Sequence, residues 1–391
     1  MKNFKFVLTG VAIAALVAGC GGGDDPKVVF TSVVSFGDSL SDAGTYRVGT
    51  IAQLGGGKFT VNSAADKNDK VWTEALATAL GAPAQCPAQT GLLPNQNGVT
   101  GAAVVNFAAC NNYAQGSSRV TANGSGSNGV ALQKAPFNQV NLGFMADSIQ
   151  NQVNRHLTKV SSFGGSDLVT VNAGGNDFFM QLGAVGVAAG GGATAAGAGT
   201  IAGWPAATIT TVSGGGAAAA NAASSAAVAA MGQAGAELAG YVKTLMVGKG
   251  ARFVVMRKLG DLNVTPFGLG FDAATKQLST AMASAFNTQL AQGLAGVAGV
   301  YLFDDYARSQ AIAANPASVG HTNVTRPACG PNGFSQPGDT VGESIVCNGT
   351  NLIAGDTSKY AFADDVHPTP FGHQVAADFT LDLLRKAGLR L

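Results

Sequence analysis

Short segments rich in β-branched residues alternate along this chain with longer segments of helical periodicity, and this alternation restricts the fold more than any other feature. Strands are expected at residues 28–36, 167–172, 251–256 and 300–303. Helices are expected at residues 71–80, 137–157, 234–246, 278–294 and 370–387. Strands that are separated by helices favour a parallel sheet covered by helices on both faces. The sequence therefore predicts an α/β fold with a central parallel sheet.

No clean linker divides the chain, so we expect one domain over residues 28–391. Within it, residues 183–235 form an insert rich in glycine and alanine with few charges. One interpretation is a tolerated insertion with little structure of its own. The other is a lid over an apolar substrate, since lids are long loops beside the site.

The composition is that of a protein with a sizeable core and no attraction for nucleic acid. Of its 391 residues, 46% are hydrophobic and only 12% are charged. The formal net charge is +1, and no basic patch interleaved with aromatic residues is present. We therefore expect no nucleic-acid partner.

The N-terminus is typical of an exported bacterial lipoprotein. Two lysines precede an apolar run, residues 6–18, that is too short to span a bilayer as a stable helix. The run ends in Leu-Val-Ala-Gly-Cys, which resembles a lipobox, so residues 1–19 are the expected signal peptide and Cys20 the lipidated residue. Residues 20–27 form a Gly/Asp tether. The alternative is a secretory signal with a coincidental cysteine. The expected location is the bacterial cell envelope, lipid-anchored in the outer membrane or periplasm, or outside the cell.

The remaining cysteines predict disulfides and no metal centre. Their number is even, as is usual in an exported chain that forms disulfides: Cys86, Cys110, Cys329 and Cys347. Of the three connectivities, we favour Cys86–Cys110 and Cys329–Cys347, because each closes a local loop rich in glycine and asparagine. No Cys-x-x-Cys or histidine cluster has zinc spacing, so neither a metal nor another cofactor is expected.

Three polar clusters stand where the predicted strands end or where the last helix begins. Ser39 follows the first strand, Asn176 follows the second, and His367 precedes the final helix. A serine hydroxyl needs a base to become a good nucleophile, and His367 can be that base. An acceptor must orient its imidazole; Asp364 stands three residues earlier, whereas the spacing of the alternative, Asp365, tends to point its side chain away.

Acyl transfer also needs donors for the oxyanion, and the same clusters supply candidates. The Asn176 amide follows a glycine pair that allows close approach, and the backbone N–H groups of Ser39 and Gly116 are further donors. Each cluster alone also has an ordinary interpretation as a turn or a capped helix start. Together the ordinary interpretations are less convincing, because three separate turns would each have to contain, by coincidence, a residue that the same catalytic site requires.

In combination these motifs resemble the GDSL, or SGNH, family of serine esterases and lipases. The matching segments are Phe-Gly-Asp-Ser-Leu-Ser-Asp-Ala-Gly at 36–44, Gly-x-Asn-Asp at 174–177 and Asp-x-x-His-Pro-Thr at 364–369. Weaker matches lie at 57–60, 71–72 and 252–266, and the segment 315–329 is similar to the exported bacterial branch of the family. The Gly-x-Ser-x-Gly elbow of the ordinary α/β-hydrolases does not fit around Ser39.

The resemblance implies a three-layer α/β/α sandwich and hydrolysis of carboxylic esters through a serine acyl-enzyme. It makes Ser39 the nucleophile and an oxyanion donor, His367 the base, and Asp364 the residue that orients it. Gly116 and Asn176 would complete the oxyanion hole. The family usually has two glycines where this chain has Gly116-Ser117-Ser118, so the Ser117 N–H takes the role if the second glycine carries the donor.

The substrate class stays open at this level. The first hypothesis is an esterase or lipase for hydrophobic acyl esters. The alternatives are a phospholipase or acyltransferase, a carbohydrate O-acetylesterase, and a non-catalytic surface binding lipoprotein. The expected partners are a small-molecule or lipid ester and, through the lipidated N-terminus, a membrane.

Overall fold

The computed structural model describes residues 27–391 apart from 64–68, 94–98, 124–126, 130–145 and 336. The expected signal peptide 1–19, the lipidated Cys20 and all but the last residue of the tether 20–27 lie outside the described residues. Among the helices that are described, none has the length and apolar character needed to cross a membrane.

The centre of the fold is a parallel sheet, as the alternation of strands and helices predicts. Its four strands stand in the order β1 (Ser32–Gly37), β6 (Asp167–Asn172), β7 (Phe253–Arg257) and β8 (Val300–Phe303). Gly37 pairs with Asn172, Asn172 with Arg257, and Arg257 with Phe303. The carboxyl ends of the strands are therefore level, and the loops that follow them meet at one edge of the sheet.

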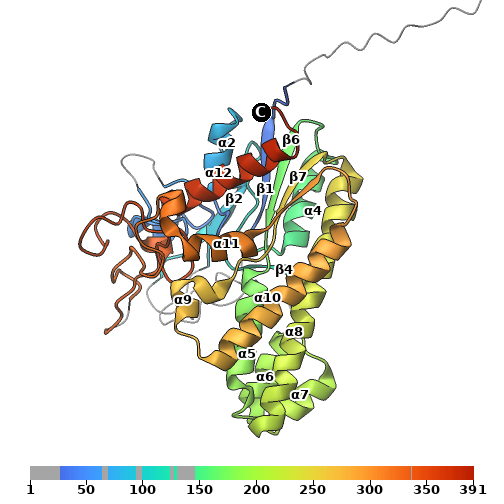
Figure 1. The fold of residues 1–391 in the computed structure, drawn as a ribbon, viewed down its shortest axis with the longest axis vertical. Coiled ribbons are helices and arrows are strands. Elements are labelled where there is room, and N and C mark those ends of the chain that lie inside the picture. The colour runs from blue at the N-terminus through green and yellow to red at the C-terminus, as the bar shows by residue number, and fades with distance from the viewer. Residues whose placement is uncertain (1–26, 64–68, 94–98, 124–126, 130–145, 336) are drawn as a thin grey trace, which may run out of the picture.

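Helices cover both faces of this sheet (Figure 1). Val33, on one face, belongs to a buried cluster with α2 (Trp72–Ala79) and α12 (Pro370–Lys386). Its neighbour Val34 points to the other face and packs in a cluster with α4 (Ile149–Val160), α8 (Gly216–Tyr241) and α10 (Ala273–Leu294). The expected three-layer α/β/α sandwich is confirmed.

The glycine- and alanine-rich insert is helical, so the expectation that it has little structure of its own is wrong. It contains the end of α5 (Gly175–Ala188), then α6 (Gly192–Ile201), α7 (Ala206–Ser213) and most of α8. These helices extend away from the sheet (Figure 1). Alanine has the highest helix propensity, and small side chains let helices approach closely. A Cβ on Gly235 of α8 would lie 2.3 Å from the carbonyl oxygen of Phe286 in α10.

Two helix starts also differ from the sequence-based expectation. Helix α4 begins at Ile149 rather than at residue 137, because Ser148 caps it by accepting a hydrogen bond from the Asn151 N–H. Residues 137–145 lie outside the described part of the chain. Helix α8 begins at Gly216 rather than at residue 234, and a π-helical turn, Val242–Met246, continues it.

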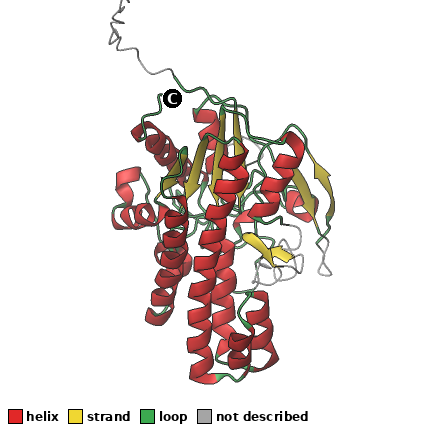
Figure 2. Ribbon diagram, turned by 90° about the vertical axis from the view of Figure 1, so that its right-hand side faces the viewer, coloured by secondary structure: helices red, strands yellow, loops and turns green. Residues whose placement is uncertain are grey.

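Several short elements complete the described fold. Figure 2 shows two small antiparallel sheets apart from the central one, β2 (Gln89–Leu92) with β3 (Ala102–Asn106), and β4 (Ser118–Asn123) with β5 (Ser127–Gly129). The short helices are α1 (Gly49–Gln53), α9 (Pro266–Leu269) and α11 (Asp305–Ala314). Disulfides join Cys86 to Cys110 and Cys329 to Cys347, which confirms the expected pairing.

Candidate active site

Ser39 lies on a tight turn directly after β1, at the carboxyl edge of the sheet. Leu40 N–H donates to the Asp38 carboxylate over 3.1 Å, and Ser41 N–H donates to the Asp38 carbonyl over 3.1 Å. The turn needs glycine at position 37, because a Cβ there would lie 2.7 Å from the carbonyl oxygen of Asn172. The turn thus fixes Ser39 on the wall of a cavity, where it is 9% exposed.

The loop before α12 brings His367 to this serine from 328 residues away in the chain. Nε2 of His367 lies 2.9 Å from Oγ of Ser39, and Nδ1 lies 2.7 Å from Oδ2 of Asp364. The carboxylate that contacts the imidazole is therefore that of Asp364, three residues earlier. The carbonyl oxygen of Asp365 accepts a hydrogen bond from the Phe267 N–H over 3.0 Å.

The Asp364 carboxylate accepts hydrogen bonds from three backbone N–H groups as well as from His367. Oδ1 accepts hydrogen bonds from Val366 N–H at 2.9 Å and His367 N–H at 2.7 Å, and Oδ2 accepts from Ser344 N–H at 3.1 Å. Burial acts to raise the pKa of Asp364, but the charge of His367 and these hydrogen bonds lower it well below its ordinary range. For His367, burial favours the neutral ring, but the Asp364 carboxylate raises the pKa of the imidazole above its ordinary value.

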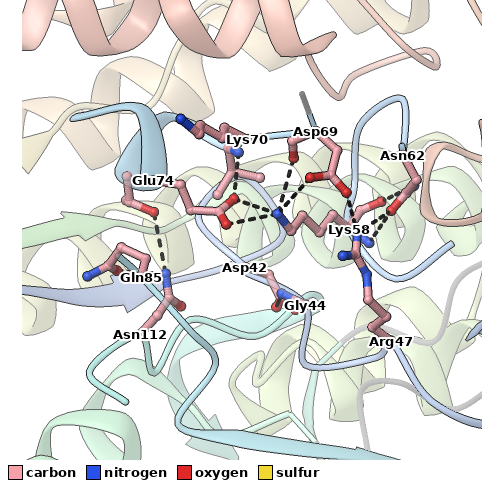
Figure 3. A network of polar contacts seen from close by, with 12 residues as sticks. Asp42, Gly44, Arg47, Lys58, Asn62, Asp69, Lys70, Glu74, Gln85 and Asn112 are labelled. Atoms are coloured by element: carbon pink, nitrogen blue, oxygen red, sulfur yellow. Dashed lines mark hydrogen bonds and ion pairs between the residues drawn. The ribbon is translucent and has the colours of Figure 1, made fainter. Parts of the chain in front are cut away.

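A segment after the nucleophile supports the base. The ring of Phe59 packs against the imidazole of His367, with their centroids 5.1 Å apart, and Thr60 Oγ1 donates to the Pro368 carbonyl over 2.9 Å. The buried Lys58 anchors the segment, because its ammonium contacts both carboxylate oxygens of Glu74 at 2.8 Å and Asp69 at 3.2 Å (Figure 3). Only the weak motif match at residues 57–60 indicated that this segment belongs to the site.

Asn62 extends this support toward the acid. Its Nδ2 group donates to the carbonyl oxygens of Ser344 and Cys347, both at 3.0 Å, and its Oδ1 accepts from the Lys58 N–H at 2.9 Å. Figure 3 shows Asn62 beside Lys58 in the same network. Since Ser344 N–H donates to Asp364, the network connects the anchored segment to the carboxylate.

Of the predicted oxyanion donors, Asn176 and Ser39 line the cavity and Gly116 does not. Asn176 stands in the first turn of α5, and its Nδ2 group donates one hydrogen bond to the Ser118 carbonyl over 2.9 Å, which orients the amide. The assignment of Gly116 needs correction, because its N–H donates to the Asp42 carboxylate over 2.9 Å. This use of the N–H was not visible from the local sequence.

Ser117, the alternative candidate for the oxyanion donor, lies on the cavity wall where Gly116 was expected. It lines the cavity, and no acceptor for its N–H is found among the described residues, as is also true of the Ser39 N–H. Its φ of 72° lies in the left-handed region that favours glycine. This backbone fits the second glycine of the family pattern, and the structure therefore favours Ser117 over Gly116.

The cavity beside Ser39 has a volume of about 490 Å³ and polar and apolar walls. On the polar side, the buried Arg257 contacts Asp305 and lies 4.7 Å above the ring of Trp72. Asp38 is also buried here, and desolvation raises the pKa of its carboxyl to about 6. No cluster of His, Cys, Asp and Glu side chains suited to a metal ion occurs in the part of the chain that the structure describes.

Comparison with protein families identifies a match over most of the chain. The model of the family described as GDSL-like Lipase/Acylhydrolase matches residues 33–379. The matched range contains Ser39, Ser117, Asn176, Asp364 and His367. No curated protein matches the chain.

Proposed function

Because the chain belongs to the family of GDSL-like lipases and acylhydrolases, which act on esters, we propose that it hydrolyses carboxylic esters through a triad of Ser39, His367 and Asp364. One observation carries the proposal. Hydrogen bonds of 2.7 Å and 2.9 Å link Asp364 to His367 and His367 to Ser39. In this arrangement the imidazole has its acceptor on Nδ1 and faces the hydroxyl with Nε2, as general-base catalysis requires.

In the proposed reaction, Ser39 Oγ attacks the ester carbonyl carbon while His367 Nε2 takes the hydroxyl proton. The negative charge that develops on the carbonyl oxygen is stabilised by the N–H groups of Ser39 and Ser117 and by the Asn176 amide. His367 then gives the proton to the departing alcohol, and the acyl group stays on Ser39. A water molecule, deprotonated by His367, then attacks the acyl carbonyl, and the carboxylic acid is released as Ser39 Oγ takes the proton back from His367.

A fluorophosphonate probe tests the nucleophile directly. It should label Ser39 in the parent protein, and Ser39→Ala should lower kcat by about 10³-fold or more with little loss of stability. Ser318→Ala is the matched control, since this exposed serine lies on a short helical turn, Pro316–Val319, away from the cavity. Near-parental turnover by Ser39→Ala, or labelling of another residue, would refute the role.

We also propose that the protein is an exported bacterial lipoprotein, anchored in the cell envelope through Cys20. The lipobox-like sequence supports this proposal, and so do the two disulfides, which persist in oxidising compartments. Mass spectrometry of protein from a bacterial envelope should find diacylglyceryl-modified Cys20 at the mature N-terminus. Cleavage at another residue would count against the anchor.

A further inference from the structure

One side of helix α5 forms an apolar wall that starts at the candidate oxyanion donor. Asn176, Phe179, Leu182 and Gly183 of α5 all line the cavity and are only partly buried. Their spacing places them on one stripe of the helix. The intervening Phe178 is fully buried in the core, so the side chains of α5 divide between the core and the cavity.

The opposite wall comes from the segment that follows β7. Leu259, Leu262, Val264 and Phe267 line the cavity there, and the ring of Phe267 lies 5.6 Å from that of Phe179 in an edge-to-face arrangement. The two walls enclose an apolar groove, which we define by Phe179, Leu182, Gly183, Leu259, Leu262, Val264 and Phe267. A groove of this kind favours hydrocarbon and disfavours hydroxyl groups, which would lose their hydrogen bonds to water.

We propose that the groove binds the acyl chain of the ester and that Gly183 limits the length of chain it accepts. The inference rests on the proposed function, since the direction of the acyl chain is argued from the candidate triad and Asn176. The departing oxygen must lie beside His367 Nε2, which protonates it, whereas the carbonyl oxygen lies toward Asn176 at the head of α5. The acyl substituent is then the part of the ester that follows α5 past Phe179 to Gly183.

Gly183 is the determinant because it is the member of the stripe without a side chain. Its half-exposed position lies two turns beyond Asn176, so a side chain there projects into the groove at a distance from the reacting carbonyl. Through α5, the first helix of the glycine- and alanine-rich insert contributes to substrate selection. Gly183 is the one residue of the insert in this wall, so the insert begins where the wall ends.

The test is the ratio of kcat/KM for an octanoyl ester to that for an acetyl ester of the same alcohol. Gly183→Phe should lower this ratio by at least ~10-fold, because each methylene excluded from an apolar pocket is worth about 10-fold or more. The matched control is Gly197→Phe, which adds the same side chain to the exposed side of α6 outside the cavity lining, where a Cβ meets nothing within 4 Å. The control should keep the ratio within about twofold of the parent's value.

A second variant guards against misfolding of the first. Leu182→Asn keeps a similar shape but adds an amide that an acyl chain would desolvate, so it should also lower the octanoyl-to-acetyl ratio. Parental ratios in both variants, or an effect confined to esters with long alkyl alcohols, would overturn the inference. The proposed function fails separately, if the parent hydrolyses none of these esters or if Ser39→Ala is as active as the parent.

Discussion

The ring of Phe59 packs against the imidazole of His367 and closely approaches the backbone of Gly116. The Phe59 and His367 centroids are 5.1 Å apart, and a Cβ on Gly116 would lie 2.3 Å from the Phe59 ring. Tyr46 packs its ring edge-to-face against Phe59 at 6.2 Å and donates its hydroxyl to the Gly116 carbonyl over 2.8 Å. One buried aromatic ring therefore contacts both the candidate base and the turn that carries the Ser117 N–H.

Removing this ring should slow the reaction without removing any reacting group. Phe59→Ala leaves the imidazole free to tilt away from Ser39, and a misplacement of this kind can cost up to ~10²-fold in kcat. Phe59→Leu, which keeps part of the packing, should recover part of the loss. Steady-state kinetics of both variants on one ester give the measurement. A parental kcat for Phe59→Ala would show that the imidazole holds its position through Asp364 alone.

The acid that orients His367 can be identified by paired amide substitutions. Asp364→Asn should lower kcat by up to ~10⁴-fold, because it imposes the wrong imidazole tautomer, whereas KM should change little. Asp365→Asn should behave like the parent. If Asp365→Asn loses kcat and Asp364→Asn keeps the parental kcat in the same assay, Asp365 is the residue that orients His367.

The pH profile gives an independent reading of the same pair. His367 must be neutral to accept the proton, so kcat/KM of the parent should rise with pH through one apparent pKa. Burial lowers the pKa of the imidazole, but the Asp364 carboxylate raises it above the ordinary value of a histidine. The midpoint of the parent's profile should therefore lie above about pH 6.5, and that of Asp364→Asn should lie lower. Both profiles should be measured from about pH 5 to about pH 9.

The candidate triad could be proposed from sequence because each motif is local and carries its own turn, and its role in the reaction stays a prediction. Ser39 and His367 could be paired from sequence, although 328 positions separate them, because a serine nucleophile needs a base and His367 can be that base. The assignment of Gly116 was wrong because its N–H is used by Asp42, a contact that forms only when two distant turns meet. The contacts of Phe59 with His367 and of Ser344 with Asp364 could not be read from the sequence for the same reason.

The insert was misread for a different physical reason. Residues 183–235 were treated as low-complexity sequence, for which little structure is expected when apolar burial is small. Alanine nevertheless favours helix, and Ala219, Ala223 and Ala227 of α8 are fully buried. Small side chains thus form a packed helical surface that composition alone does not reveal.

The disulfide between Cys329 and Cys347 should support catalysis as well as stability. Cys329 N–H donates to the carbonyl of Ala363, the residue before Asp364, over 2.9 Å, and Ser344 N–H donates to Asp364 itself. The bridge spans 18 residues, for which the chain-entropy model gives about 3 kcal/mol of stabilisation. Replacing both cysteines by alanine should lower the unfolding free energy by about that amount and also lower kcat, since Asp364 loses part of its support.

Replacing Cys86 and Cys110 by alanine is the matched comparison. This bridge spans 24 residues, so its loss should cost a similar unfolding free energy. It lies on the loop before Asn112 and contributes no contact to Asp364, so kcat should stay near the parental value. Urea unfolding and kinetics on folded protein separate the two effects. Equal losses of kcat in both double variants would contradict a specific role for the Cys329–Cys347 bridge.

His373 should make the folded protein sensitive to acid. Its side chain is 1% exposed, and burial, with the nearby charge of Arg257, lowers the pKa of the imidazole to about 3. A histidine in the unfolded chain has a pKa of about 6.5. Between these values the unfolded chain binds a proton that the folded protein does not, so the unfolding free energy falls as the pH falls. At pH 5 the loss due to this group is about 2 kcal/mol.

His373→Gln removes this titration while keeping a polar side chain at the position. Urea unfolding at about pH 5 and pH 8 should show a smaller fall in unfolding free energy on acidification for the variant than for the parent, by about 2 kcal/mol. His156→Gln should act in the same direction, because burial lowers the pKa of His156 to about 4. The carboxyls of Asp38 and Asp42 oppose both histidines in the parent, since burial raises the pKa of each to about 6, and the comparison of parent with variant cancels their effect. An unchanged pH dependence in His373→Gln would mean that His373 is already protonated in the folded protein at pH 5.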